Sequence, residues 1–232
     1  SVSAFLLNRS SDLEIDNKEL TIPLDPDLSA SDNAKKYFDK YAKLKRTAEA
    51  LDTYIEQSKT ELELLKSIET ALNIAETETD LADIRRELSD HGFIKKHAGN
   101  KKEKSKKSKP LHFVDDNGFD IYVGKNNYQN DELTFKFATG NDWWFHTKKI
   151  HGSHVIVKTN GKELPDSTYE HAAELAAYYS SGRDTDKVEI DYLQKKNVKK
   201  PASAVAGFVV YYTNYSMVVT PTLEHVKLVG EE

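Results

Sequence analysis

The chain has 232 residues, of which 31% are charged and 38% are hydrophobic, and it contains no cysteine. The lack of cysteine excludes disulfide bonds, thiol catalysis and zinc or iron–sulfur sites with cysteine ligands. No apolar run approaches the ~18 residues of a membrane-spanning helix, so we expect no membrane insertion. Because the chain begins with Ser1 and not methionine, we expect it to be a piece of a longer protein.

The formal net charge of −5 is unevenly distributed along the chain. Residues 1–94 carry −8, residues 95–110 carry +7 and residues 111–232 carry −4. Positive charge is therefore concentrated in one short tract, which would attract polyanions locally.

Residues 1–28 predict the tail of an upstream region or a short hairpin. Glu19 to Ile22 has the composition of a strand, and it ends at Pro23 and Pro26, which interrupt regular structure.

Residues 29–96 predict a helical arm. Ser29 or Ser31 is a favourable N-cap, and neither glycine nor proline follows until Gly92. Apolar and small residues recur at steps of four and three, which is a heptad seam and not the wider stripe of a globular helix. A helix from Ser31 to about Ile74 would be about 65 Å long, and it cannot bury such a seam alone. The seam comprises Tyr37, Tyr41, Leu44, Ala48, Leu51, Ile55, Ser58, Leu62, Leu65 and Leu72.

A second, shorter helix is predicted to pack antiparallel on the distal part of the first. Thr77 and Asp80 match a capping box, and Leu81, Ile84 and Leu88 form one apolar face. The rest of the seam needs a partner that buries it, which is either the missing upstream chain or another molecule. Self-association through the coiled coil is therefore one expectation. An ordinary solvated helical hairpin has the same sequence pattern.

Residues 97–110 are basic and contain no large apolar residue, which is typical of a flexible linker. The run could also hold RNA phosphate between two modules.

Residues 111–232 predict an α+β domain of five to seven strands with one packed helix. Alternating residues predict strands at 119–123, 133–137 and 188–192, and a final hairpin of 208–212 with 217–220. Ser167 and Glu170 suggest a capping box that opens a helix, with Gly182 near its end. Taken with the arm, the expected architecture is a long antiparallel coiled coil followed by a mixed β-sheet domain.

The segment from Asp142 to Val157 contains both tryptophans of the chain and three histidines. It predicts a β-hairpin or two strands that meet at a tight corner, with His146 and His154 near the turn. One interpretation is a core hairpin in which Trp143 and Trp144 are packing residues. The other is a binding surface, because aromatic side chains beside histidine and lysine suit base stacking or a protein partner.

Catalytic and metal sites have little support in the sequence. His146, His151 and His154, with Asp142 nearby, match no usual metal-ligand spacing. Ser153 and His154 are neighbours on a strand and would point to opposite faces, and no G-x-S-x-G motif or Walker loop is present. We therefore expect no enzyme and no cofactor. Nucleic-acid binding is favoured by two lysine clusters and by the turn that contains Lys125.

Four motifs, in this order and spacing, resemble the NFACT-R domain of the NFACT family, which includes bacterial RqcH proteins, known also as fibronectin-binding protein A, and eukaryotic NEMF. The motifs are Gly118 to Asp131, Asp142 to His146, Gly152 to His154, and Lys199 to Pro201. The upstream residues 33–45 and 87–94 are similar to the coiled-coil/middle segment of the same family. The resemblance implies a tail at 1–28, a coiled-coil/middle segment at 29–96, a linker at 97–110 and an NFACT-R domain at 111–232.

The resemblance further implies a function. RqcH-type proteins bind the obstructed large ribosomal subunit and recruit tRNA so that alanine tails are added to stalled nascent chains. The expected partners are the large ribosomal subunit and tRNA, in the cytoplasm. The candidate RNA-binding residues are Lys125, Asn126, Asn127, Trp144, His146, Ser153, His154, Lys195, Lys196, Lys199 and Lys200.

The same family implies an alternative function, an anchorless adhesin at the cell surface that binds fibronectin. RNA binding predicts steep salt dependence, because salt screens phosphate contacts. Fibronectin binding predicts weaker salt dependence and sensitivity to apolar surface changes. A hydrolase at Ser153 or a histidine metal site predicts activity that is lost in His154→Ala, and we expect none.

Overall fold

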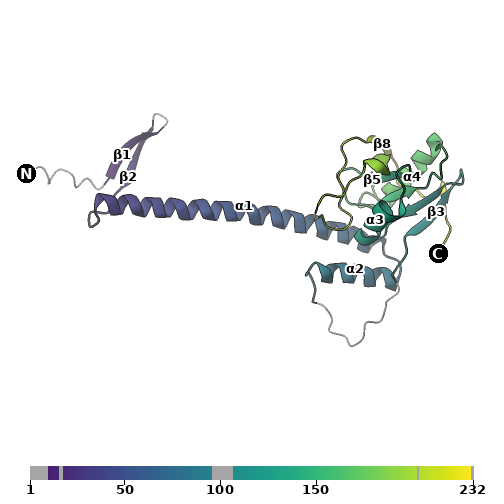
Figure 1. Cartoon of the computed structure of the whole chain (residues 1–232), viewed down its shortest axis with the longest axis horizontal. Helices are drawn as coiled ribbons and strands as arrows, with labels where there is room; N and C mark the ends of the chain where they lie inside the picture. The colour runs from purple at the N-terminus through teal and green to yellow at the C-terminus, as the bar shows by residue number, and fades with distance from the viewer. Residues whose placement is uncertain (1–9, 16–17, 96–106, 203, 231–232) are drawn as a thin grey trace, which may run out of the picture. The chain divides into compact units, whose positions relative to one another are not determined.

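The computed structural model describes residues 10–15, 18–95, 107–202 and 204–230 (Figure 1). The chain divides into two compact units, residues 1–61 and residues 62–232. Most of the predicted basic linker lies outside the described residues, which resume at Lys107. None of the described helices has the length and hydropathy needed to cross a membrane.

The first unit contains a two-stranded antiparallel hairpin and the start of helix α1. Strand β1 (Ser10–Ile15) pairs with β2 (Lys18–Pro23), which confirms the hairpin expected near residue 20. Helix α1 (Ala30–Ile74) is capped by Ser29, whose Oγ accepts a hydrogen bond from the Asp32 backbone nitrogen at 3.1 Å. Asn33 is buried, and its side chain accepts a hydrogen bond from the Asp25 backbone nitrogen at 2.8 Å. These local bonds fix where the helix begins.

The predicted heptad seam of α1 is exposed along most of its length. Tyr41, Leu44 and Leu51 are between 54% and 62% exposed. The apolar surface becomes buried only near the end of the helix, at Ile68 and Ala71. The long uninterrupted helix is therefore confirmed, and the large apolar seam residues from Tyr41 to Leu62 are exposed in the described structure.

Helix α2 (Glu78–Asp90) packs on these last turns of α1. The predicted capping box is present, since Thr77 Oγ1 accepts from the Asp80 nitrogen and an Asp80 carboxylate oxygen accepts from the Thr77 nitrogen. Ile84 meets Ile68 and Ala71 in a small apolar cluster. The second helix thus has the predicted position in the sequence. The prediction that it covers the distal seam is wrong, because it packs on Ile68 and Ala71 while the seam residues Leu65 and Leu72 are 38% and 51% exposed.

The second unit contains a seven-stranded sheet in the order β8-β7-β5-β6-β4-β3-β9. Each of its described strand pairs is antiparallel. The predicted α+β class is therefore confirmed. The predicted mixed sheet is wrong, because a mixed sheet contains parallel pairs and the described sheet contains none. The strands are β3 (Leu111–Asp115), β4 (Asp120–Val123), β5 (Trp143–Thr147), β6 (Val155–Val157), β7 (Val188–Gln194), β8 (Tyr215–Val219) and β9 (Val226–Leu228).

The tryptophan segment is the centre of this sheet. Strands β5 and β6 pair as the predicted hairpin, and Trp144 lies opposite both Ile156 and Leu193. Because side chains alternate along a strand, these three residues share one face, where they form a buried cluster with Leu133 and Val198. The sheet therefore has apolar cores on both faces.

Helix α4 (Asp166–Tyr178) covers the other face, where its alanines share a buried apolar cluster with Phe145 and Val155. The predicted capping box at Ser167 is wrong, because the helix begins one residue earlier, after Pro165, without a side-chain cap. Pro165 has a φ of −63° and a ψ of 152°, and its carbonyl accepts a hydrogen bond from the Thr168 backbone nitrogen at 3.0 Å. The helix also ends before Gly182, at Tyr178.

Two predicted strand elements are wrong. Residues Leu133–Phe137 alternate in polarity but form a π-helical turn, η1, that continues α3 (Asn127–Glu132). The expected final hairpin does not form, because β8 pairs with β7, while Val210 pairs with Lys199. The short 3-10 helix η2 (Lys195–Asn197) precedes that bridge. In both cases tertiary packing decides between structures that local alternation does not distinguish.

The burial along α1 gives a test of its unpaired seam. Ile68→Ala should lower the free energy of unfolding by about 2–5 kcal/mol, since Ile68 is 4% exposed. Leu51→Ala should change it by less than about 0.5 kcal/mol, because Leu51 is 54% exposed. Urea denaturation followed by circular dichroism measures both values. If Leu51→Ala destabilises the protein as much as Ile68→Ala, the seam is buried in solution by a second molecule.

Candidate nucleic-acid interface

The turn after β4 holds the first candidate RNA ligands, and the structure buries all three. Lys125 Nζ lies 2.7 Å from Asp80 Oδ1, and both side chains are 2% exposed. The Lys125 backbone nitrogen donates a hydrogen bond to Gln129 Oε1 at 2.9 Å. Burial acts to raise the pKa of Asp80, but the Lys125 ammonium and the Thr77 and Glu76 donors hold it below its ordinary value. The Lys125 ammonium therefore neutralises a buried carboxylate.

The two asparagines that follow have structural partners as well. The Asn126 side chain caps α3 by accepting a hydrogen bond from the Gln129 nitrogen at 3.0 Å. Asn127 Nδ2 donates to Glu87 Oε1 at 2.7 Å on α2 and to Ser67 Oγ at 2.8 Å on α1. The turn thus fastens the sheet to the α1–α2 hairpin and is not open to RNA.

The glycine that begins this turn allows its close approach to α3. A Cβ atom at position 124 would collide with the Asn130 side chain. The Asn130 side chain has a structural role in this position, because its Oδ1 accepts a hydrogen bond from the His154 backbone nitrogen at 3.0 Å. Gly124 therefore lets β4, α3 and the start of β6 meet.

Glu87 is the least expected charged residue in this junction, since it is 0% exposed. Asn127 donates to Oε1, while Oε2 has no hydrogen-bond partner among the described residues. Burial raises the pKa of this carboxyl above its ordinary value, and the Asn127 hydrogen bond only partly offsets that effect.

The tryptophan hairpin contributes core residues and not a binding surface. Trp144 is 0% exposed, and Ser153 and His154 are each 2% exposed. The His154 ring contacts Thr134 Oγ1 at 2.7 Å and the Asn130 carbonyl at 3.2 Å. This placement supports the packing interpretation of the hairpin.

The two histidines of the hairpin are neutral near pH 7. The His146 and His154 rings are 5.4 Å apart and perpendicular. Burial lowers the pKa of His146 to about 4, and burial and the His146 ring lower the pKa of His154 well below its ordinary value. Neither ring can therefore provide positive charge for phosphate.

The hypothetical histidine metal site does not assemble among the described residues. His151 forms an ion pair with Glu63 at 3.1 Å, while Asp142 binds Lys158 and the Thr139 and Thr159 nitrogens. Their partners hold these side chains in separate networks. The described contacts of the His154 ring also do not include Ser153, as a nucleophile–base pair would require.

The lysines after β7 are the candidates that reach solvent. Lys196, Lys199 and Lys200 are exposed and Lys195 is half-buried. Buried Val198 and the backbone bridge between Lys199 and Val210 hold this segment on the sheet. Within the described part of the chain, Lys195, Lys196 and Lys199 form no ion pair, whereas Lys200 lies 2.5 Å from Asp131 Oδ1.

Phe135 adds an aromatic side chain that sequence analysis missed. The ammonium groups of Lys195 and Lys200 lie 5.9 and 6.0 Å from its ring centroid. Phe135 is half-buried and lies on η1. The sequence predicts a strand for this segment, and a strand would not place the ring in the same way. We call Phe135, Lys195, Lys196, Lys199 and Lys200 the lysine–phenylalanine surface. It combines cations with a ring, as nucleic-acid sites do.

The sequence comparisons assign both parts of the chain to one family. Residues 8–107 match the family model described as NFACT N-terminal and middle domains. Residues 109–211 match the model described as NFACT protein RNA binding domain. The chain belongs to the NFACT family. The predicted resemblance is therefore confirmed for both the helical and the sheet-containing regions.

Similar curated proteins include the Rqc2 homolog RqcH of Streptococcus suis, which is 40% identical over 225 residues, and that of Bacillus subtilis, which is 36% identical over 209 residues. These alignments cover 95% and 89% of this chain but only 40% and 36% of the relatives. The chain thus spans about two fifths of their length. Neither family model is that of a recognised enzyme family.

A similar solved structure is that of the C-terminal part of the fibronectin/fibrinogen-binding protein from Streptococcus suis. It is 39% identical, has a TM-score of 0.74, and the match covers 84% of this chain and 78% of that one. The architecture described above is therefore shared with a close structural relative.

The buried ion pair predicts a large effect of Lys125. Lys125→Ala should lower the free energy of unfolding by about 3–5 kcal/mol, because Asp80 would remain buried without its counter-ion. The double variant Lys125→Met and Asp80→Asn should recover much of the loss, since it removes both charges and keeps an oxygen for the capping box. Urea denaturation at pH 7 distinguishes them. A loss below about 1 kcal/mol in Lys125→Ala would show that the pair is hydrated.

Glu87 predicts a pH-dependent effect. A carboxyl with a raised folded pKa binds more protons in the folded state, so its contribution to stability falls as pH rises above about 4.5, the ordinary value. Glu87→Gln cannot ionise and should therefore gain stability relative to the unaltered chain between pH 4.5 and 7. Thermal unfolding across this range measures the difference. The exposed Glu69→Gln is the control, and an equal trend in both variants would contradict the assignment.

Proposed function

We propose that this chain is the RNA-contacting part of an RqcH-type ribosome quality control protein in the cytoplasm. In this role it binds tRNA and the large ribosomal subunit while alanine tails are added to stalled nascent chains. The match to the NFACT RNA binding domain supports this proposal, as do the relatives named RqcH. The observation that carries it is the lysine–phenylalanine surface, where the ammonium groups of Lys195 and Lys200 lie beside the Phe135 ring and exposed Lys196 and Lys199 belong to the same segment.

The chemistry of this surface suits single-stranded or looped RNA. Lysine ammonium groups contact phosphate without reading sequence, and an aromatic ring can stack on a base. The backbone of the segment is fixed by hydrogen bonds from Lys195 to the Asp142 carbonyl at 2.8 Å and between Lys199 and Val210 at 2.9 Å. A fixed backbone lowers the conformational entropy that binding would otherwise cost.

The buried candidates have a different role in this proposal. Lys125 and Asn127 hold the RNA-binding domain and the α1–α2 hairpin together, and His154 joins α3, η1 and β6 within the domain. The domain arrangement of tail, coiled-coil/middle segment, linker and NFACT-R domain stays as proposed. The exposed seam of α1 is proposed as the arm that contacts another molecule during ribosome binding.

A salt titration tests the proposal. Binding to fluorescent tRNA should weaken steeply with salt, and changing Lys195, Lys196, Lys199 and Lys200 together to glutamine should flatten the slope. Each lost phosphate contact should reduce the slope of log K against log salt by about 0.7–0.9. Fluorescence anisotropy measured at salt concentrations from about 50 to 300 mM gives these slopes.

A matched control separates local contacts from total charge. Lys149, Lys162, Lys187 and Lys227 are exposed lysines of the same domain, and changing them to glutamine removes the same charge. The control should keep most of the slope. An equal effect in both quadruple variants would contradict a defined surface, and absent binding at low salt would place RNA recognition outside this chain.

Phe135 gives a second, independent readout. Phe135→Leu keeps apolar packing but removes the ring, so affinity should fall by about 1–3 kcal/mol per stacked base while the salt slope stays unchanged. An unchanged affinity would remove stacking from the proposal and leave the phosphate contacts alone.

Fibronectin binding at the cell surface is the second candidate function. It is favoured by the similarity to the C-terminal part of the fibronectin/fibrinogen-binding protein. Since Trp144 is buried, an adhesive surface would use the edge strand β8, where Tyr215 and Val218 are 62% and 60% exposed. Immobilised fibronectin offered under the same salt series should then bind with a shallow slope and lose affinity in Val218→Lys.

A further inference from the structure

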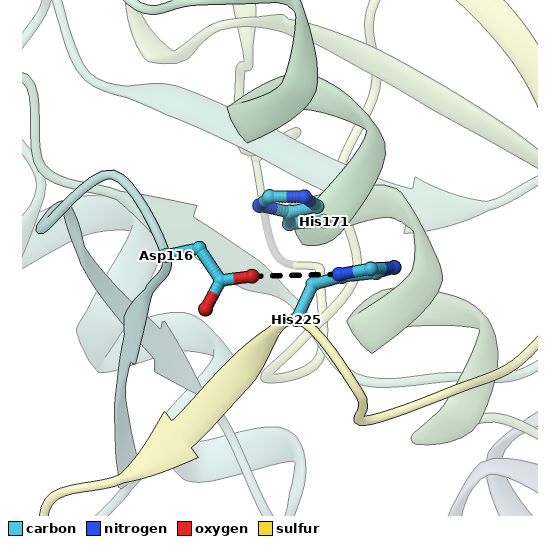
Figure 2. A group of neighbouring side chains, drawn as sticks. All are labelled: Asp116, His171 and His225. Atoms are coloured by element: carbon cyan, nitrogen blue, oxygen red, sulfur yellow. Dashed lines mark ion pairs between the residues drawn. The ribbon is translucent and has the colours of Figure 1, made fainter.

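Three residues from distant parts of the sequence meet at one edge of the sheet domain. Asp116 lies in the turn after β3, His171 lies on α4 and His225 immediately precedes β9 (Figure 2). One nitrogen or carboxylate oxygen from each residue lies within 4.8 Å of the other two. The two imidazole rings are stacked, with centroids 4.7 Å apart and planes inclined by 15°.

Two of these atoms already have the spacing of metal ligands. His225 Nδ1 is 3.4 Å from Asp116 Oδ2. In a tetrahedral zinc site with bonds of about 2.0–2.1 Å, neighbouring ligand atoms lie about 3.3 Å apart. Asp116 and His225 have half-exposed side chains, 57% and 45%, and can rotate to close on an ion, whereas His171 is buried.

His171 is held by a carboxylate that orients its ring. Asp115 is 5% exposed, and its Oδ2 lies 3.3 Å from His171 Nδ1. Thr168 Oγ1 donates to Asp115 at 2.6 Å and the Phe119 nitrogen donates at 2.8 Å. Because both of these neighbours donate to it, the Asp115 carboxylate acts as a hydrogen-bond acceptor at this position. His171 must therefore donate through Nδ1, which leaves the Nε2 lone pair for a ligand.

This arrangement of carboxylate, histidine and ligand position is typical of metal sites. A ligating histidine usually donates its second ring nitrogen to a carboxylate or carbonyl, which fixes its tautomer and orientation.

We propose that Asp116, His171 and His225 bind a divalent transition-metal ion of the zinc class, with Asp115 as the residue that positions His171. Two imidazoles and one carboxylate are ligands that suit zinc, cobalt and nickel rather than magnesium or calcium. The solvent-facing side of the site leaves a fourth position for water. The ion would join the β3–β4 turn, α4 and the start of β9.

The joining of these segments has a structural consequence. Strand β9 pairs with β3 through three residues only, Val226 to Leu228. A bound ion would add a second attachment immediately before that strand. Ligand binding to the folded state alone stabilises it by mass action, so the melting temperature should rise with metal concentration.

The test uses the whole chain after treatment with a chelator. Zn²⁺ should bind with one-to-one stoichiometry in calorimetry, and Co²⁺ should produce the visible absorption of a tetrahedral nitrogen–oxygen site. His225→Ala and Asp116→Asn should each weaken Zn²⁺ binding by about tenfold or more. His91→Ala is the control, because His91 ends α2 and lies outside the site. Mg²⁺ at the same concentrations should produce neither signal.

Each outcome decides the proposal. No heat with Zn²⁺ and no Co²⁺ absorption would overturn it, as would unchanged Zn²⁺ affinity in both site variants or an equal loss in His91→Ala. Circular dichroism without metal checks that the variants fold. If His225→Ala does not fold, Asp116→Asn decides, since its side chain is exposed and keeps its shape.

Discussion

The buried pair of Lys125 and Asp80 is the constraint on which the junction of sheet and helices depends. Removing two charges from water is costly, and it is tolerated only when geometry and further hydrogen bonds are good. Asp80 meets this requirement because one oxygen faces Lys125 while the other caps α2 through the Thr77 nitrogen. The same residue thus starts the helix and binds the sheet. Asn127 and Glu87 continue the contact two turns further along α2.

How much the sequence predicts depends on how local the decisive interaction is. The capping box at Thr77 and the heptad pattern of α1, which is broken only at Glu69, are local, and the sequence predicts both helices within a few residues. A lysine in a turn is usually solvated, so the sequence predicts Lys125 on an RNA surface. Its actual partner, Asp80, is 45 positions away and cannot be found from local sequence. The strand expected at Leu133–Phe137 failed for the same reason, since packing of Leu133 against Trp144 decides its conformation.

The sequence predicts the positive charge of the candidate site, but it does not predict how the side chains of the site are arranged. Lysines at 195, 196, 199 and 200 reach solvent as expected, because Val198 between them is the residue that anchors the segment. Phe135 could not be found by pattern, since it precedes these lysines by 60 positions. The cluster of Asp116, His171 and His225 is equally non-local, and only the pairing of β9 with β3 brings its members together. The sequence motifs are sufficient to predict the family. The burial of each side chain in the structure is needed to distinguish structural residues from exposed ones.

Helix α1 runs without interruption from Ala30 to Ile74. Its last turns are held by Ile84 and by the Asn127 contact to Ser67, so the costly first turn of helix formation is supplied by tertiary structure. The upstream residues then need only propagation, which is governed by helix propensity and by pairs such as Lys59 with Glu56. Helix α1 consequently propagates from turns that tertiary contacts already hold, and the Ser29 and Asn33 hydrogen bonds close its N-terminal end.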